Sequence, residues 1–172
     1  TGSIWVLSIV GVLTLILLSA CTPAAAQSIQ FDGIAYDLDQ AAVLYRESHF
    51  VARADDGGGE RVVLYRCPDG QPFARKRIVY GADAAVPAFE LLDARIGYRE
   101  GVRELFVQRA AHLAEKSGPL PEAEGLVADA GFDEFVQRNW DALQGGATVR
   151  FPFLLPSKLD YFNFKVSKHH EE

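Results

Sequence analysis

The sequence predicts an α+β fold that is mainly antiparallel sheet, either a curved β-meander or an open half-barrel, packed against one amphipathic helix. Two observations lead to this prediction. Short runs rich in β-branched and aromatic residues recur along the chain, separated by turns that contain glycine or proline. The spacing of apolar residues then changes to three and four over about residues 129–144, which is typical of a helix with one apolar face.

The first predicted strands form a hairpin. Residues 43–54 and 60–67 flank Asp55-Asp56-Gly57-Gly58-Gly59, whose glycines allow the positive φ angles of a tight reversal. The next connection, Cys67-Pro68-Asp69-Gly70, has proline at the second turn position and glycine at the fourth, the distribution of a type I turn. A third strand is therefore expected over residues 72–80.

Two more strands are predicted over residues 88–93 and 102–109. Consecutive strands joined by short turns pair as antiparallel neighbours, which gives the meander. Residues 110–128 are predicted to be an exposed loop, because Gly118-Pro119-Leu120-Pro121 interrupts regular structure.

The predicted helix begins at Asp129, which can serve as its N-cap, and ends at Gly145-Gly146. Five residues at spacings of three and four form its apolar face: Phe132, Phe135, Val136, Trp140 and Leu143. A helix of this kind buries its apolar face against a sheet.

Two last strands are predicted over residues 147–155 and 159–167, joined by Pro156-Ser157-Lys158. The chain ends shortly after the second of them. Because an unpaired edge strand is a liability, we expect the natural protein to continue beyond Glu172.

Composition indicates a single globular domain and excludes one class of partner. The 172 residues carry a formal net charge of -6, and 49% of them are hydrophobic. Binding to a nucleic-acid backbone depends on cationic side chains, so no nucleic-acid partner is expected. The sequence does not specify an oligomeric state.

The amino-terminal segment is predicted to be an export signal. No charged residue precedes Asp32, and residues 4–20 are almost wholly apolar. Small residues follow this run, as signal peptidases require, in place of the Lys or Arg of a membrane anchor.

Leu18-Ser19-Ala20-Cys21 resembles a bacterial lipobox. The resemblance implies that Cys21 receives a lipid, becomes the first mature residue and anchors the protein to a membrane. Thr22 in the next position, where these signals can carry Asp, implies the outer membrane, facing the periplasm. The predicted organisation is a signal peptide over residues 1–21, a tether over 22–31 and one β-rich domain over 32–172, truncated at its C-terminus.

The alternative is an ordinary secretory signal. Ala24-Ala25-Ala26 then forms the cleavage site, Cys21 is discarded, and a soluble periplasmic protein begins at Gln27.

Two wider resemblances agree on the compartment. The order of elements is similar to that of envelope half-barrels that carry lipoproteins or bind lipid. Residues 60–165 resemble a group of proteobacterial envelope proteins without an assigned activity, through three stretches: residues 65–76, Gly97-Tyr98-Arg99-Glu100-Gly101 and Phe151-Pro152-Phe153. Both resemblances imply the cell envelope and bring no catalytic residues.

Cys67 would be the single thiol of a mature domain in an oxidising compartment. It can be a small buried residue, a partner in an intermolecular disulfide, or a reactive thiol activated by Arg66, Arg75 or His49. His49 and its neighbour Ser48 point to opposite faces of a strand, so they cannot form a catalytic pair with each other.

The predicted function is a binding or interaction module of the cell envelope, for an apolar or lipid ligand held between sheet and helix. Seven aromatic residues are candidates to line that site: Phe132, Phe135, Trp140, Phe151, Phe153, Phe162 and Phe164. A closed aromatic core is the competing explanation for them.

Two other functions stay open: an enzyme that uses Cys67 or His49, and a structural envelope component that docks through a sheet edge. The enzyme is the less favoured, because the sequence contains no G-x-S-x-G, H-E-x-x-H, C-x-x-C or P-loop motif. No cofactor and no metal are predicted, since His169-His170-Glu171-Glu172 lies at a terminus where ligands are poorly preorganised.

Overall fold

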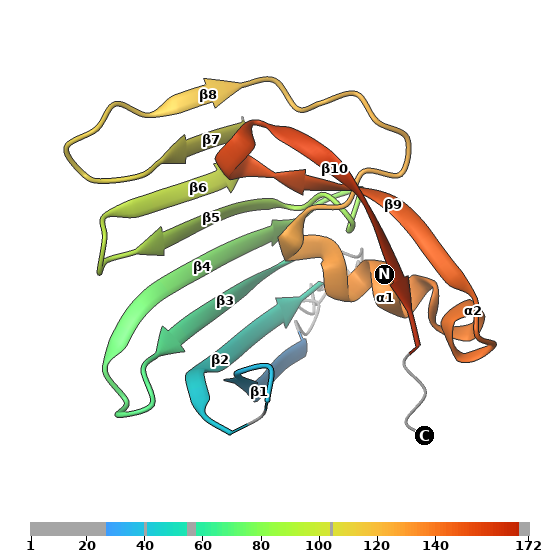
Figure 1. Cartoon of the computed structure of the whole chain (residues 1–172), viewed down its shortest axis with the longest axis horizontal. Coiled ribbons are helices and arrows are strands. Elements are labelled where there is room, and N and C mark those ends of the chain that lie inside the picture. The colour runs from blue at the N-terminus through green and yellow to red at the C-terminus, as the bar shows by residue number, and fades with distance from the viewer. Residues whose placement is uncertain (1–26, 40, 55–57, 104, 169–172) are drawn as a thin grey trace, which may run out of the picture.

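The computed structural model describes residues 27–39, 41–54, 58–103 and 105–168, and its main feature is an open, curved sheet of eight strands (Figure 1). The strands lie side by side in chain order, and each is antiparallel to the next. They are β1 (Gln27–Tyr36), β2 (Val43–Arg53), β3 (Gly59–Arg66), β4 (Pro72–Tyr80), β5 (Ala88–Asp93), β6 (Tyr98–Val102), β7 (Leu105–Gln108) and β8 (Lys116–Gly118). The predicted fold class, an open curved meander, is confirmed.

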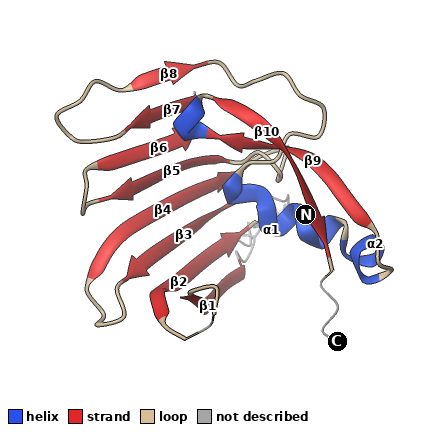
Figure 2. Ribbon diagram, viewed as in Figure 1, coloured by secondary structure: helices blue, strands red, loops and turns tan. Residues whose placement is uncertain are grey.

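A second layer crosses the concave face of this sheet, and Figure 2 shows all its helical turns on that side. It begins with a turn of 3-10 helix, η1 (Asp129–Gly131), followed by α1 (Phe132–Arg138) and α2 (Trp140–Gln144). A separate hairpin completes the layer: β9 (Thr148–Leu155) and β10 (Asp160–Ser167), joined by η2 (Pro156–Lys158). These two strands pair only with each other and form a sheet separate from the eight-stranded one.

The strands form where the sequence alternates, and the alternation decides which side chains face the second layer. In β2 the half-buried and buried residues at positions 45, 47, 49 and 51 alternate with exposed ones at 44, 46, 50 and 52, with Ser48 half-buried. The turn at Cys67-Pro68-Asp69-Gly70 closes as expected, with the Gly70 amide donating to the Cys67 carbonyl at 2.9 Å. Gly70 has a φ of 91°, which favours glycine.

The core lies between the two layers in two clusters. The larger one packs sheet residues against η1 and β9: Val63, Ile78, Tyr80, Phe89, Val102, Leu105, Ala128, Ala130 and Leu154. The smaller one packs the helical segment against β9: Ala85, Val127, Phe135 and Phe151. The second layer is thus held to the sheet mainly by apolar burial.

Two predicted elements differ in the structure. The predicted strand over residues 102–109 corresponds to β7 (Leu105–Gln108), whereas Val102 ends β6 (Tyr98–Val102), a strand that was not predicted; the chain reverses where Val102 pairs with Leu105. The predicted loop over residues 110–128 contains the edge strand β8, and its end is buried. There the Val127 amide donates to the Pro152 carbonyl, and the Leu154 amide donates to the Val127 carbonyl.

The predicted helix over residues 129–144 is broken. Asp129 is not its N-cap: α1 starts after Gly131 without a side-chain cap. At Asn139 the side-chain amide donates to the Phe135 carbonyl at 2.8 Å, and a new helical segment starts at Trp140. The break turns Trp140 out of the buried face, and its side chain is 53% exposed.

The predicted tether over residues 22–31 also needs correction. Strand β1 begins at Gln27 and pairs with β2, so that Phe31 lies opposite His49. The lipobox, Cys21 and the alternative cleavage site at Ala26 lie outside the described residues, as does His169-His170-Glu171-Glu172. No helix in the described ranges is long and apolar enough to cross a membrane.

Candidate functional site

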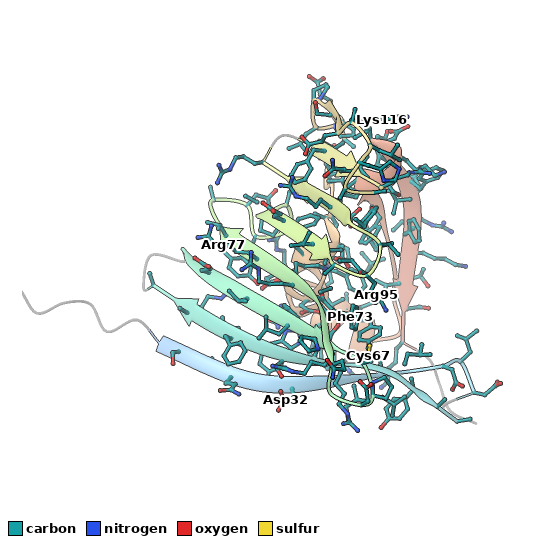
Figure 3. The ribbon with its side chains drawn as sticks, turned by 90° about the vertical axis from the view of Figure 1, so that its left-hand side faces the viewer. Asp32, Cys67, Phe73, Arg77, Arg95 and Lys116 are labelled. Atoms are coloured by element: carbon teal, nitrogen blue, oxygen red, sulfur yellow. The ribbon has the colours of Figure 1, made fainter. Side chains whose placement is uncertain are left out.

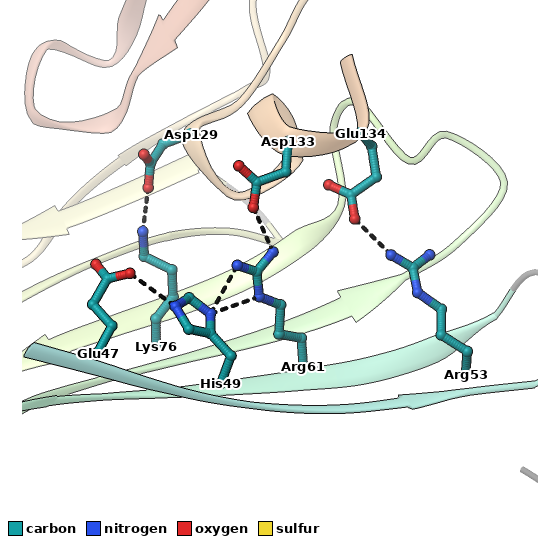
Figure 4. A network of polar contacts seen from close by, with 8 residues as sticks. All are labelled: Glu47, His49, Arg53, Arg61, Lys76, Asp129, Asp133 and Glu134. Atoms are coloured by element: carbon teal, nitrogen blue, oxygen red, sulfur yellow. Dashed lines mark hydrogen bonds and ion pairs between the residues drawn. The ribbon is translucent and has the colours of Figure 1, made fainter. Parts of the chain in front are cut away.

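The concave face of the sheet carries a row of polar side chains beneath the helical segment. Alternation places Glu47 and His49 of β2, Arg61 of β3 and Lys76 of β4 on this face. Three acidic residues approach from the other layer: Asp129, Asp133 and Glu134 (Figure 4). The site therefore lies at the boundary between sheet and helix.

His49 is the centre of this row, and only 5% of its surface is exposed. Its ring stacks on Phe31, with the ring centres 4.4 Å apart. Arg61 donates to Nδ1 from Nε at 3.1 Å and from Nη2 at 2.8 Å. A guanidinium group can only donate, so Nδ1 accepts and the proton sits on Nε2, which donates to Glu47 at 2.8 Å. Both ring nitrogens are therefore occupied.

Three ion pairs join the sheet to the helical segment. Arg61 Nη1 lies 2.8 Å from Asp133, Arg53 Nη2 lies 2.6 Å from Glu134, and Lys76 pairs with Asp129 (Figure 4). The carboxylates of Asp129 and Asp133 are half-exposed, so solvent screens these two pairs. The pairs link η1 and α1 to the sheet, in addition to the apolar packing between the layers.

Lys76 is about as enclosed as Arg61, since their side chains are 11% and 10% exposed. Burial lowers the pKa of Lys76, but Asp129 and the Tyr65 hydroxyl outweigh that effect and raise it to about 12. The ammonium group thus stays charged at neutral pH. A small polar pocket of about 170 Å³ lies around it, between His49, Arg61 and Asp129.

An apolar groove adjoins this pocket and is much larger, about 560 Å³. Ile29, Phe31 and Val51 form its sheet side, and Phe132, Val136 and Trp140 form its helix side. Ile29 and Trp140 are each 53% exposed, so their apolar surfaces face the open space. Arg53, Arg61, Asp133 and Glu134 border the groove at its polar end.

The seven aromatic residues proposed as ligand-lining fall into three groups. Phe132 and Trp140 do line the apolar groove. Phe135 and Phe151 are buried against each other, with ring centres 4.4 Å apart, and belong to the core. Phe153 packs beside them, while Phe162 and Phe164 are about half-exposed on β10. For Phe135 and Phe151 the closed-core explanation is therefore correct.

Cys67 lies apart from this site, at the turn after β3, and is half-buried. Arg95 lies close enough to the Cys67 sulfur to interact with it (Figure 3). Arg95 stacks on Phe73 at 3.7 Å and forms an ion pair with Asp93 at 2.5 Å. His49 is committed to the separate network with Arg61 and Glu47.

The basic cluster at residues 75–77 is divided between the two faces. Lys76 points to the concave side, whereas Arg75 and Arg77 border a hollow of about 410 Å³ on the convex side (Figure 3). Arg77 donates twice to Glu60, at 2.7 and 2.8 Å. Acidic partners thus offset much of the positive charge there.

Several residues of the site were not singled out from the sequence, namely Ile29, Phe31, Glu47, Arg61, Tyr80 and Glu134. Strand alternation predicts that Glu47 and His49 share a face, so their proximity could have been predicted from the sequence. The part played by Arg61 follows from the register of β2 with β3, which a single sequence does not determine.

Comparison with models of protein families, with curated proteins and with solved structures found no match. No cluster of three or more potential metal ligands occurs among the described residues.

Proposed function

We propose that the protein is a lipid-anchored binding module of the bacterial cell envelope that holds an apolar or lipid ligand in the apolar groove. One observation carries the proposal: large apolar side chains from β1 and from α1 and α2 face the same open space of about 560 Å³. Contiguous exposed apolar surface marks interaction sites, and this volume is within the range of small-molecule sites.

The polar network supports this role by holding the groove open. The ion pairs of Arg53 and Arg61 fix α1 at one end, and the core cluster around Phe135 fixes its buried face. The groove walls are thereby set before a ligand arrives, which reduces the ordering cost of binding. Catalysis by His49 has less support, because both of its ring nitrogens are already bonded.

A pair of substitutions in β1 tests the groove. Ile29 faces it, whereas Ile34 is also largely exposed, 45%, but lies on the opposite face of the same strand. Ile29→Glu should weaken binding of an apolar fluorescent probe by roughly 10-fold or more, because a carboxylate is poorly solvated in an apolar site. Ile34→Glu should leave it unchanged. The full chain is best held in an amphipathic polymer, since detergent would compete for the groove.

Equal effects of the two substitutions, or no probe binding by the native protein, would contradict the groove as a ligand site. Native mass spectrometry of protein purified gently from its host gives a second measurement. We expect a bound apolar molecule that is lost from Ile29→Glu and kept in Ile34→Glu.

The lipid anchor is a separate part of the proposal and has its own test. The intact mass of the mature protein should equal the chain from Cys21 onward plus a lipid group. A mature chain that begins at Gln27 would instead identify a soluble periplasmic protein, without changing the proposal for the groove.

A further inference from the structure

Two buried polar atoms at the border of the apolar groove lack a hydrogen bond of ordinary geometry within the described part of the chain, although one of them, a tyrosine hydroxyl, lies near Arg61 and Glu134. They are the Tyr80 hydroxyl and Glu134 Oε2. Tyr80 ends β4 and is only 4% exposed, and both residues border the groove. The other carboxylate oxygen of Glu134 accepts from Arg53 at 2.6 Å. Buried polar atoms are nearly always paired, so this donor and this acceptor call for a partner.

The two atoms offer opposite hydrogen-bonding roles. Burial raises the pKa of Tyr80, the Arg61 side chain close to the hydroxyl opposes this change, and the nearby Glu134 carboxylate raises the pKa further. The phenol therefore keeps its proton and can donate. Glu134, ion-paired with Arg53, can only accept through its free oxygen. A group that both accepts and donates would satisfy both atoms.

The charge at this end of the groove is balanced. Arg53 and Arg61 are each paired with an acidic residue, Glu134 and Asp133. A ligand with a charged head group would find no unpaired counter-charge among these four side chains. The balance favours a neutral head group.

We propose, building on the groove as an apolar-ligand site, that its ligand is a single-chain lipid with a neutral hydroxyl or amide head group that accepts from Tyr80 and donates to Glu134. A hydroxyl or a secondary amide supplies both roles, whereas a carboxylate cannot donate and an ammonium cannot accept. The volume of about 560 Å³ suits one acyl chain better than the two chains of a diacyl lipid.

The test compares four ligands of one chain length: a monoacylglycerol, a fatty acid, a fatty amine and the plain alkane. Each competes with the apolar fluorescent probe for the full chain in an amphipathic polymer. We expect the monoacylglycerol to bind most tightly. Tyr80→Phe should weaken it roughly 3- to 10-fold, the usual effect of losing one hydrogen bond, and leave the alkane unchanged. Tyr45→Phe, on the same face of the sheet but outside the groove, is the matched control.

Glu134→Gln provides a second measurement that does not depend on Tyr80. Removal of the negative charge should shift the preference of the groove toward the fatty acid. Tightest binding of the fatty acid or the amine by the native protein, or no effect of Tyr80→Phe on the monoacylglycerol, would overturn the head-group assignment while the groove remains a ligand site. Failure of all four ligands and the probe to bind would reject the groove itself.

Discussion

At the scale of single residues, Glu100 differs from the other acidic groups near the concave face. It accepts a hydrogen bond from Tyr98, and it has no ion pair with a cation within the described residues. Burial raises the pKa of Glu100, and the hydrogen bond from Tyr98 opposes this rise. The nearby Asp129 raises the pKa further, while Lys76 lowers it. The folded protein therefore binds the proton more tightly than the unfolded chain does.

Because the folded protein binds the Glu100 proton more tightly than the unfolded chain does, we expect Glu100→Gln to stabilise the protein at neutral pH. A raised carboxyl pKa contributes stability at low pH that is lost as the pH rises through its folded-state value. The neutral amide avoids this loss and can still accept from Tyr98. We expect a gain of about 1 kcal/mol in the free energy of unfolding at pH 7, the scale of a poorly compensated buried polar group. Urea unfolding measures it.

The gain should shrink as the pH falls through the raised folded-state pKa of Glu100, and it should be absent below about 4, where the carboxyl is protonated in the folded and the unfolded chain alike. Glu124→Gln, at an exposed position, is the matched control and should show no gain at either pH. A Glu100→Gln protein that is less stable than the native one at pH 7 would contradict this account.

At the scale of elements, the start of the helical segment is fixed by a close approach of two backbones. The Ala128 amide donates to the Ala85 carbonyl at 2.8 Å, and the 3-10 turn then brings Gly131 against the same residue. A Cβ atom on Gly131 would lie 2.3 Å from the Ala85 carbonyl oxygen. Glycine is needed here for space, because its φ of -108° is open to other residues.

Gly131→Ala should therefore destabilise the fold by about 1–3 kcal/mol, the usual cost of overpacking. Gly145 ends α2 with a φ of -72°, and its nearest contact for a Cβ atom is 3.4 Å away. Gly145→Ala should be neutral or stabilising, by less than about 1 kcal/mol. Thermal unfolding of the two variants side by side checks the difference. Equal melting temperatures would contradict the prediction, because they would mean that the backbone around Ala85 moves to make room for the Cβ atom at little cost in free energy.

At the scale of the whole molecule, the two layers enclose several groups that hold protons tightly. Burial is the largest cause of the raised pKa of Tyr45, Tyr65, Tyr80 and Tyr98, and acidic neighbours add to it. Lys76, with its pKa raised to about 12, lies among them. Ionisation of these side chains is thus coupled to opening of the space between the layers.

The protein should accordingly lose stability in alkaline solution. A tyrosine or lysine whose pKa is raised by folding contributes stability below its unfolded value, about 10 for both, and that contribution disappears as the pH rises through the folded-state value. We expect the urea midpoint to fall steeply above pH 10, together with the ultraviolet signal of tyrosinate. A midpoint that stays constant from pH 9 to 11 would contradict the coupling.

Some elements of the molecule follow from local sequence signals, and others do not. The strands at residues 72–80 and 88–93 match their predicted bounds, because alternation and turn residues are local signals. The division of residues 98–108 into β6 and β7 was missed, since Val102 and Leu105 are both apolar and the reversal between them has no glycine or proline. The helix break at Asn139 depends on a side-chain bond to the backbone that competes with helix formation.

The sequence by itself determined the meander: strand period, turn chemistry and the one segment of helical spacing all act over a few residues. Only the tertiary structure decided which aromatic residues are core and which face a ligand site, and which cations meet which acids. Phe132 and Phe135 have the same chemistry and lie on one face of one helix, yet one borders the apolar groove and the other is buried against Phe151. The reason is physical, because burial depends on what the opposite layer covers, and that layer comes from residues far away in the chain.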